Sequence, residues 1–157
     1  MTGSSLRILA LAAAVFSVSC GHKSRPAPQP VTKPAVTAKP AAPAQGRVSV
    51  IDMSALFSLQ QSGKVLLYDV RPSFVHGFGH LAGAVSWPRG SFDQDYARHE
   101  PEIRAALAAD KNVVLYCTDA ACPDSRAVAA RLAEKGFSVS VLEGGYNAWK
   151  DAGMPVE

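Results

Sequence analysis

The sequence has few cysteines, few aromatic residues and no long apolar run. Its 157 residues include three cysteines, and 8% of them are aromatic. Three cysteines are too few to build a disulfide-stapled miniprotein, so a folded part must depend on a packed core. The longest apolar stretch covers residues 8–18 and is interrupted by Ser17. Such a stretch is shorter than the roughly 20 residues that a transmembrane helix needs.

Acidic residues are missing from the first 46 positions, which hold five basic residues. Residues 47–157 hold the other eleven basic residues and all thirteen acidic ones, which leaves a net charge of −2. The formal charge of +3 for the whole chain therefore arises in the N-terminal segment. A domain this close to neutrality lacks the basic surface that nucleic acids require, and we expect no nucleic-acid partner.

Residues 1–19 are typical of a secretory signal, with one cation at Arg7 and an apolar core at residues 8–18. Small residues then precede Cys20, which resembles the lipobox of bacterial lipoproteins, although Ser17 stands where leucine is usual. The resemblance implies lipidation of Cys20 and a membrane anchor. Ordinary cleavage that leaves Cys20 as a free thiol is the alternative. Because Gly21 rather than aspartate follows, we expect an outer-membrane lipoprotein on the periplasmic side of a bacterial envelope.

Residues 20–46 follow as the candidate lipidated cysteine and a linker rich in proline, alanine and lysine. Residues 21–46 contain six prolines and six alanines. Proline disfavours both helices and strand pairing, and few side chains here could build a core. We expect a semi-rigid spacer, extended by about 3.1 Å per residue, that holds a domain away from the membrane.

Residues 47–157 predict one α/β domain. We expect strands over residues 64–70, 84–87, 112–116 and 137–142, and helices over residues 53–61, 101–109, 123–135 and 146–151. Strands that alternate with helices predict a mainly parallel central sheet with helices on both faces. Ligands of such sheets bind beyond the carboxyl ends of the strands. The strongest strand pattern, at residues 112–116, ends directly before Cys117.

Cys117 begins a loop that leads into a predicted helix. Free N–H groups and the helix dipole favour an anion there, so the pKa of a cysteine thiol should be lowered. Asp119 and Asp124 oppose this effect, and Arg126 could offset them. The alternative is that Cys117 fills space at a strand end, since free cysteines are often buried. The candidate active-site loop comprises Thr118, Asp119, Ala120, Ala121, Cys122, Pro123, Asp124, Ser125 and Arg126.

Three sequence blocks together resemble a single rhodanese domain. The first is Asp69-Val70-Arg71 followed by Gly79-His80-Leu81-Ala82-Gly83-Ala84, and the second is the strand that ends at Cys117 with its loop. The third runs from Leu142 to Trp149 and closes with Gly153-Met154-Pro155. The resemblance covers residues 47–157 and implies a rhodanese-like three-layer α/β fold.

The resemblance also implies a sulfurtransferase. In that reaction Cys117 takes sulfane sulfur from a donor such as thiosulfate or polysulfide and becomes a persulfide. The N–H groups of the loop hold the persulfide, and a thiol acceptor then removes the sulfur. No metal and no organic cofactor is implied. A non-catalytic binding module remains an alternative for the domain.

The loop is longer than usual for single rhodanese domains, because Ser125 follows Cys117 by eight positions and Cys122 lies between them. A disulfide needs Cα atoms about 5.5–6 Å apart, which a curled loop can supply. Cys122 could be a resolving thiol that attacks the Cys117 persulfide. The two cysteines could instead form a dithiol redox centre, or Cys122 could merely cap the helix. Their spacing matches no usual zinc pattern.

Related folds that dephosphorylate their substrates carry an arginine six positions after the cysteine. Here Pro123 occupies that position, and Arg126 is nine positions away. The phosphatase signature is therefore absent.

Several other residues carry weaker expectations. Asp69 and Arg71 are predicted to form an ion pair or a hydrogen-bond network that supports the loops at the mouth of the site. Arg89 could face the same end of the sheet. His76 and His99 are expected at the surface.

Overall fold

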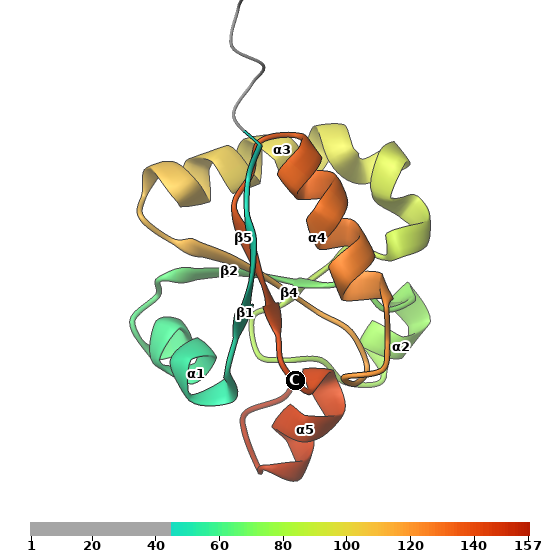
Figure 1. Cartoon of the computed structure of the whole chain (residues 1–157). Helices are drawn as coiled ribbons and strands as arrows, with labels where there is room; N and C mark the ends of the chain where they lie inside the picture. The colour runs from blue at the N-terminus through green and yellow to red at the C-terminus, as the bar shows by residue number, and fades with distance from the viewer. Residues whose placement is uncertain (1–44) are drawn as a thin grey trace, which may run out of the picture. The chain divides into compact units, whose positions relative to one another are not determined.

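The structure is a computed structural model, and it describes residues 45–157. Five parallel strands form one sheet in the order β1-β5-β4-β2-β3, with helices on both faces (Figure 1). The strands are β1 (Val48–Ile51), β2 (Val65–Asp69), β3 (Val85–Ser86), β4 (Asn112–Tyr116) and β5 (Val139–Leu142). The helices are α1 (Met53–Gln61), α2 (Ser73–Gly77), α3 (Phe92–Ala108), α4 (Asp124–Glu134) and α5 (Gly145–Asp151), with a short 3-10 turn η1 (Arg89–Ser91). The predicted α/β fold with a parallel sheet is confirmed.

The predictions for the signal, for Cys20 and for nearly all of the spacer concern residues 1–44 and lie outside the described residues. Within residues 45–157, no helix is long and apolar enough to cross a membrane.

Successive side chains of β4 point to opposite faces of the sheet, so the strand contributes to a core on each face. Val114 and Tyr116 belong to the core that α1 and α5 cover, whereas Val113, Leu115 and Cys117 belong to the core that α3 and α4 cover. All five side chains are buried. A strand that is buried on both faces has a continuous run of apolar residues in its sequence. Residues 112–116 could therefore be predicted as a strand.

Helix α1 shows how local sequence sets the ends of an element. The Asp52 carboxylate accepts a hydrogen bond of 2.8 Å from the N–H of Ala55, which is the side-chain cap expected at a helix start. The helix ends at Gln61, and Gly63 follows with a φ of +66°. Glycine adopts this left-handed conformation without a steric penalty, so the helix ends here at little energetic cost.

Helix α3 differs from the prediction. We expected a helix from Pro101 to residue 109, but α3 begins at Phe92 and carries Pro101 in its interior. Proline removes one backbone hydrogen bond and normally costs about 3 kcal/mol inside a helix. The buried side chains of Phe92, His99 and Ile103 lie on either side of Pro101. Their packing against the sheet keeps the helix continuous through the proline.

Candidate active site

The candidate site lies at the carboxyl end of β4, the third of the five strands in the sheet. Cys117 follows the strand, and the loop of residues 117–123 leads into the first turn of α4 at Asp124. The Cys117 side chain is only 3% exposed, whereas Cys122 is half-buried. The two cysteines therefore differ in their access to solvent, and Cys122 is the more accessible one.

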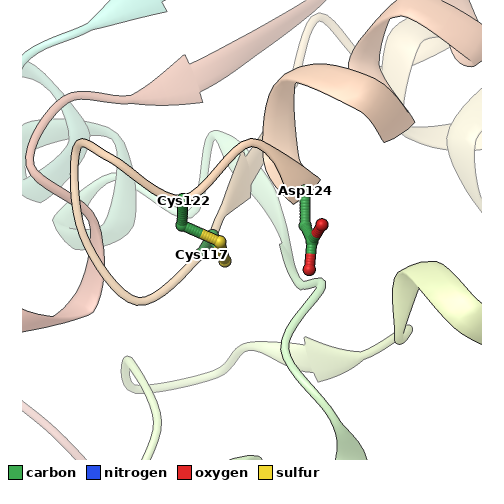
Figure 2. A group of neighbouring side chains, drawn as sticks. All are labelled: Cys117, Cys122 and Asp124. Atoms are coloured by element: carbon green, nitrogen blue, oxygen red, sulfur yellow. A yellow bond between two sulfur atoms is a disulfide. The ribbon is translucent and has the colours of Figure 1, made fainter.

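Cys117 and Cys122 form a disulfide across this loop (Figure 2). Their Cα atoms are 6.1 Å apart, within the usual range for a disulfide. Figure 2 also shows the Asp124 carboxylate beside the bonded sulfur atoms. The structure thus describes the oxidised state, in which neither cysteine offers a free thiol.

Asp119 holds the backbone of the loop. Its Oδ1 accepts hydrogen bonds from the N–H groups of Ala121 at 2.9 Å and of Cys122 at 3.0 Å. These two N–H groups belong to the set that the family resemblance assigns to the persulfide. In the oxidised state they bind the Asp119 carboxylate instead. The sequence had indicated only an unfavourable charge at Asp119, although aspartate commonly makes such local turns.

Two arginines contact the loop and its end at Asp124. Arg126 was expected to offset the charges of Asp119 and Asp124, but its contact is with the backbone. Arg126 donates from Nη1 to the carbonyl oxygen of Ala120 at 3.2 Å, so its side chain holds the loop backbone. Arg89 pairs with Asp124, with Nη1 and Oδ1 2.7 Å apart. The cation that neutralises Asp124 is therefore Arg89, which reaches it from the segment after β3. Its position beyond a strand end was the only sequence signal for this contact.

Asp124, Cys117 and Cys122 form a compact group, because one carboxylate oxygen and the two sulfur atoms all lie within 4.8 Å of one another. Cysteine binds metals as a thiolate, so the closed disulfide removes two ligands from this set. In the oxidised state the group is a charged carboxylate beside a disulfide.

The N-terminus of α5 holds the start of the loop in place. The N–H of Tyr146 donates to the carbonyl oxygen of Cys117, and that of Asn147 donates to the carbonyl oxygen of Thr118, both at 2.9 Å. Gly145 has a φ of +63°, and a Cβ at this position would lie 2.6 Å from the Cys117 carbonyl oxygen. Only glycine allows this approach.

Asp69 and Arg71 form the ion pair that the sequence predicted. Arg71 Nη2 lies 2.6 Å from Asp69 Oδ2, and both side chains are buried. The Tyr116 hydroxyl donates to the same oxygen at 2.8 Å, and His76 Nδ1 lies 3.0 Å from it. Arg71 also donates to the Gly79 carbonyl oxygen at 2.8 Å. Burial raises the pKa of Asp69, but the hydrogen bonds from Arg71 and Tyr116 outweigh it, so the pKa lies below its ordinary value.

This network supports the site from the opposite face of the sheet. Tyr116 and Cys117 are consecutive, so their side chains belong to different cores. The Arg71 guanidinium lies 4.1 Å from the centre of the Tyr146 ring. Tyr146 in turn donates its N–H to Cys117, so the ion pair is linked to the loop through α5. Tyr116 and Gly79 were missing from the predicted network.

The expectation that His99 is at the surface is wrong. His99 is 1% exposed, packs against the rings of Tyr68 and Trp87, and has Nδ1 2.9 Å from a carboxylate oxygen of Glu102. The early start of α3 turns this residue toward the sheet. His76 is partly buried through its contact with Asp69.

The sequence profile of the rhodanese-like domain family matches residues 52–152. The chain belongs to this family. Cys117 lies within the matched range, at the carboxyl end of β4 and at the start of the loop that leads into α4.

The chain matches proteins of different lengths, and it covers a different share of each. A curated relative, an HTH-type transcriptional regulator of Mycobacterium tuberculosis, is 31% identical over 110 residues, which are 68% of this chain and 44% of the relative. The chain thus spans less than half the length of that protein. A solved structure of a protein from Bacillus halodurans is 26% identical with a TM-score of 0.59 and covers 69% of this chain and 76% of that one. A thiosulfate sulfurtransferase from Pseudomonas aeruginosa is 27% identical with a TM-score of 0.56 and covers 72% of this chain and 20% of that one.

Proposed function

We propose that this domain is a sulfurtransferase in which Cys117 carries the transferred sulfur. After reduction of the disulfide, the Cys117 thiolate attacks the outer sulfur of thiosulfate. A new sulfur–sulfur bond forms on Cys117, the old one breaks, and sulfite leaves with the electron pair. A polysulfide donor would react in the same way and lose a shorter polysulfide. An acceptor thiolate then attacks the outer sulfur of the persulfide and regenerates the Cys117 thiolate.

The position of Cys117 is the observation that carries this proposal. Its side chain lies where β4 ends and the loop leads into α4, whose first N–H groups have no partner within the helix. Such groups and the helix dipole stabilise a thiolate or a persulfide anion. The similarity to a thiosulfate sulfurtransferase supports thiosulfate as a donor.

Other parts of the site would help an anionic donor to approach. Arg89 neutralises Asp124 beside the sulfur atoms, which reduces the repulsion between this carboxylate and thiosulfate. Reduction frees Cys122 and opens the sulfur of Cys117 to the donor, while the Asp119 carboxylate keeps its hydrogen bonds to the N–H groups of Ala121 and Cys122. Asp69 and Arg71 act as positioning residues, because they hold the strand end without touching the cysteines.

The test is an intact-mass measurement on the full chain with Cys20→Ser, so that the two loop cysteines are the only ones present. The protein is reduced, freed of reductant and mixed with thiosulfate, and released sulfite is quantified. We expect one sulfite for each chain in this protein and in a further Cys122→Ser variant, with one added sulfur retained in the latter. A Cys117→Ser variant should release no sulfite and gain no sulfur. Sulfite release that survives Cys117→Ser would contradict the proposal.

A dithiol redox protein is the second candidate, and the closed disulfide favours it. This function needs both cysteines, whereas persulfide formation needs only Cys117. Disulfide exchange with a small dithiol, lost in Cys122→Ser, together with no sulfite release by any variant, would establish this candidate instead. A binding module would retain its partner in Cys117→Ser.

We also propose that the domain acts on the periplasmic side of a bacterial envelope, anchored through lipidated Cys20. The charge and spacing of the N-terminal sequence support this proposal. Fractionation of cells that express the full chain tests it: Cys20→Ser should move the protein from the membrane to the soluble fraction, and Ser19→Ala should not. An unchanged membrane fraction in Cys20→Ser would rule out the lipid anchor.

A further inference from the structure

We propose that Cys122 resolves the Cys117 persulfide and releases its outer sulfur as hydrosulfide, so that the domain reduces sulfane sulfur at the expense of a dithiol. This inference rests on the proposed persulfide of Cys117. It assigns an internal acceptor to the reaction, in place of an external thiol that would carry the sulfur away. The disulfide in the structure is then the product of each turnover.

The resolving step balances without any further reactant. The Cys122 thiolate attacks the sulfur of Cys117, and the bond between the two cysteines forms. The bond from Cys117 to the outer sulfur breaks, and that sulfur leaves with the electron pair and its proton as hydrosulfide. The two cysteines are thereby oxidised, and the sulfane sulfur is reduced.

The geometry of the loop places Cys122 for this attack. The cysteines bond with their Cα atoms 6.1 Å apart, so the attacking sulfur can reach Cys117 from within the same loop. The Asp119 carboxylate binds the N–H groups of Ala121 and Cys122, which holds the backbone of Cys122 over the strand end. Intramolecular attack from a held position has a high effective concentration. An external acceptor has to compete with it.

The product disulfide is open to reduction on one side only. Cys117 is buried among the side chains beneath α3 and α4, whereas Cys122 is partly exposed. A hollow of about 140 Å³ lies beside Cys122 and is lined in part by Asp119, Ser125 and Arg126. An incoming thiolate therefore reaches the sulfur of Cys122 and not that of Cys117.

Attack on Cys122 expels the sulfur of Cys117 as a thiolate. This thiolate lies where the loop leads into α4, and a helix N-terminus stabilises an anion. The incoming thiol forms a mixed disulfide with Cys122. The second thiol of the same dithiol then attacks that bond, so the dithiol leaves as a disulfide and both cysteines return to thiols. A dithiol reductant is thus a co-substrate that balances the reaction.

One experiment separates this inference from the proposed function. The reduced full chain with Cys20→Ser is given thiosulfate without free thiol, and sulfite, hydrosulfide and intact mass are followed. We expect one sulfite and one hydrosulfide for each chain, and a final mass two hydrogens below that of the dithiol form. With Cys122→Ser added, we expect one sulfite, no hydrosulfide and a lasting gain of one sulfur.

The other outcomes are equally distinct. A persulfide that persists in the chain with both cysteines, without hydrosulfide, overturns the resolving role and leaves the transferase intact. No sulfite from either protein overturns the proposed function itself.

A second variant tests the contribution of Asp119. Asp119→Ala should slow hydrosulfide release by about tenfold, because Cys122 is no longer held near Cys117, while sulfite release continues. Asp119→Asn retains an acceptor oxygen and should restore most of the rate. Equal slowing of both steps in Asp119→Ala would contradict the positioning role.

Peptide mapping tests the direction of reduction. The oxidised chain is mixed with a monothiol and quenched with acid, and the mixed disulfide is expected on Cys122. A mixed disulfide on Cys117 would overturn that assignment.

Discussion

Gly145, at the start of α5, packs against the backbone of the cysteine loop. A Cβ there would lie 2.6 Å from the carbonyl oxygen of Cys117 and 2.8 Å from the nitrogen of Asp119. The three nearest atoms all belong to the backbone, so a substitution must move the backbone. The backbone position of Cys117 thus depends on a residue that has no reactive group of its own.

We expect Gly145→Ala to destabilise the domain by about 2 kcal/mol, from its left-handed backbone alone, and to slow persulfide formation by moving the strand end. Gly153→Ala is the matched control, because Gly153 has a φ of +70° but nothing lies within 4 Å of the place that a Cβ would occupy. The control should lose only the part that comes from the left-handed backbone, about 2 kcal/mol, while its rate of sulfite release stays normal. Urea unfolding and single-turnover sulfite assays measure the two effects. Equal rates in both variants would show that the close contact has no role in the reaction.

At the scale of elements, the Asp69–Arg71 pair joins β2 to the segment that precedes β3. Arg71 reaches the carbonyl oxygen of Gly79, and Tyr116 brings β4 into the same network. The hydroxyl of Tyr116 accepts a further hydrogen bond from the N–H of Leu81. The segment after β2 and the end of β4 are thus held together beneath the site.

We expect Asp69→Asn to reduce the free energy of unfolding by about 3 kcal/mol at neutral pH, because Arg71 is left buried without its counter-charge. The pKa of Asp69 is lowered on folding, so the unfolded chain binds more protons and the contribution is complete above the ordinary value of 3.8. It is lost as the pH falls below that value. The difference between wild type and variant should therefore shrink in acid.

Unfolding in urea across this pH range measures the difference. Asp93→Asn is the control, because Asp93 is largely exposed and pairs with Arg131 at the surface. Such pairs contribute at most about 1 kcal/mol. A difference between Asp69→Asn and wild type that does not change with pH would contradict the assignment.

At the scale of the whole molecule, backbone hydrogen bonds hold both ends of the domain. Strand β1 pairs only with β5, from Val48–Val139 to Ile51–Leu142. The C-terminal residue Glu157 exchanges backbone hydrogen bonds with His80. Both segments fall outside residues 52–152, the range that the family profile matches.

We expect a fragment of residues 52–152 to be less stable than residues 45–157 by at least about 2 kcal/mol, since several backbone hydrogen bonds are lost at each end. Fragments of residues 52–157 and 45–152 assign the loss to one end. Thermal unfolding measures it. Equal melting temperatures for all four proteins would show that the ends contribute nothing.

The disulfide is expected to stabilise the oxidised domain as a whole. It closes a short loop, and the restriction of the unfolded chain corresponds to about 2 kcal/mol. A dithiol reductant should therefore lower the melting temperature of the protein with both cysteines. Cys122→Ser is the control, and its melting temperature should not respond. A response of equal size in the control would mean that the reductant acts elsewhere.

Local sequence by itself determined the elements whose ends and faces depend on neighbouring residues. The aspartate cap and the glycine after residue 61 defined α1, and the buried apolar run defined β4, so the position of Cys117 at a strand end followed directly. These features are readable because the physical cause lies within a few residues. The three sequence blocks that resemble rhodaneses indicated the family.

Only the tertiary structure decided the remaining features, because their causes lie far apart in the sequence. Packing against the sheet carries α3 through Pro101 and buries His99. Arg89 meets Asp124 across 35 positions. The exposure of Cys122 and the burial of Cys117 depend on how the loop lies over the core, which no local pattern encodes. The proposed division of roles between the two cysteines rests on that difference in exposure.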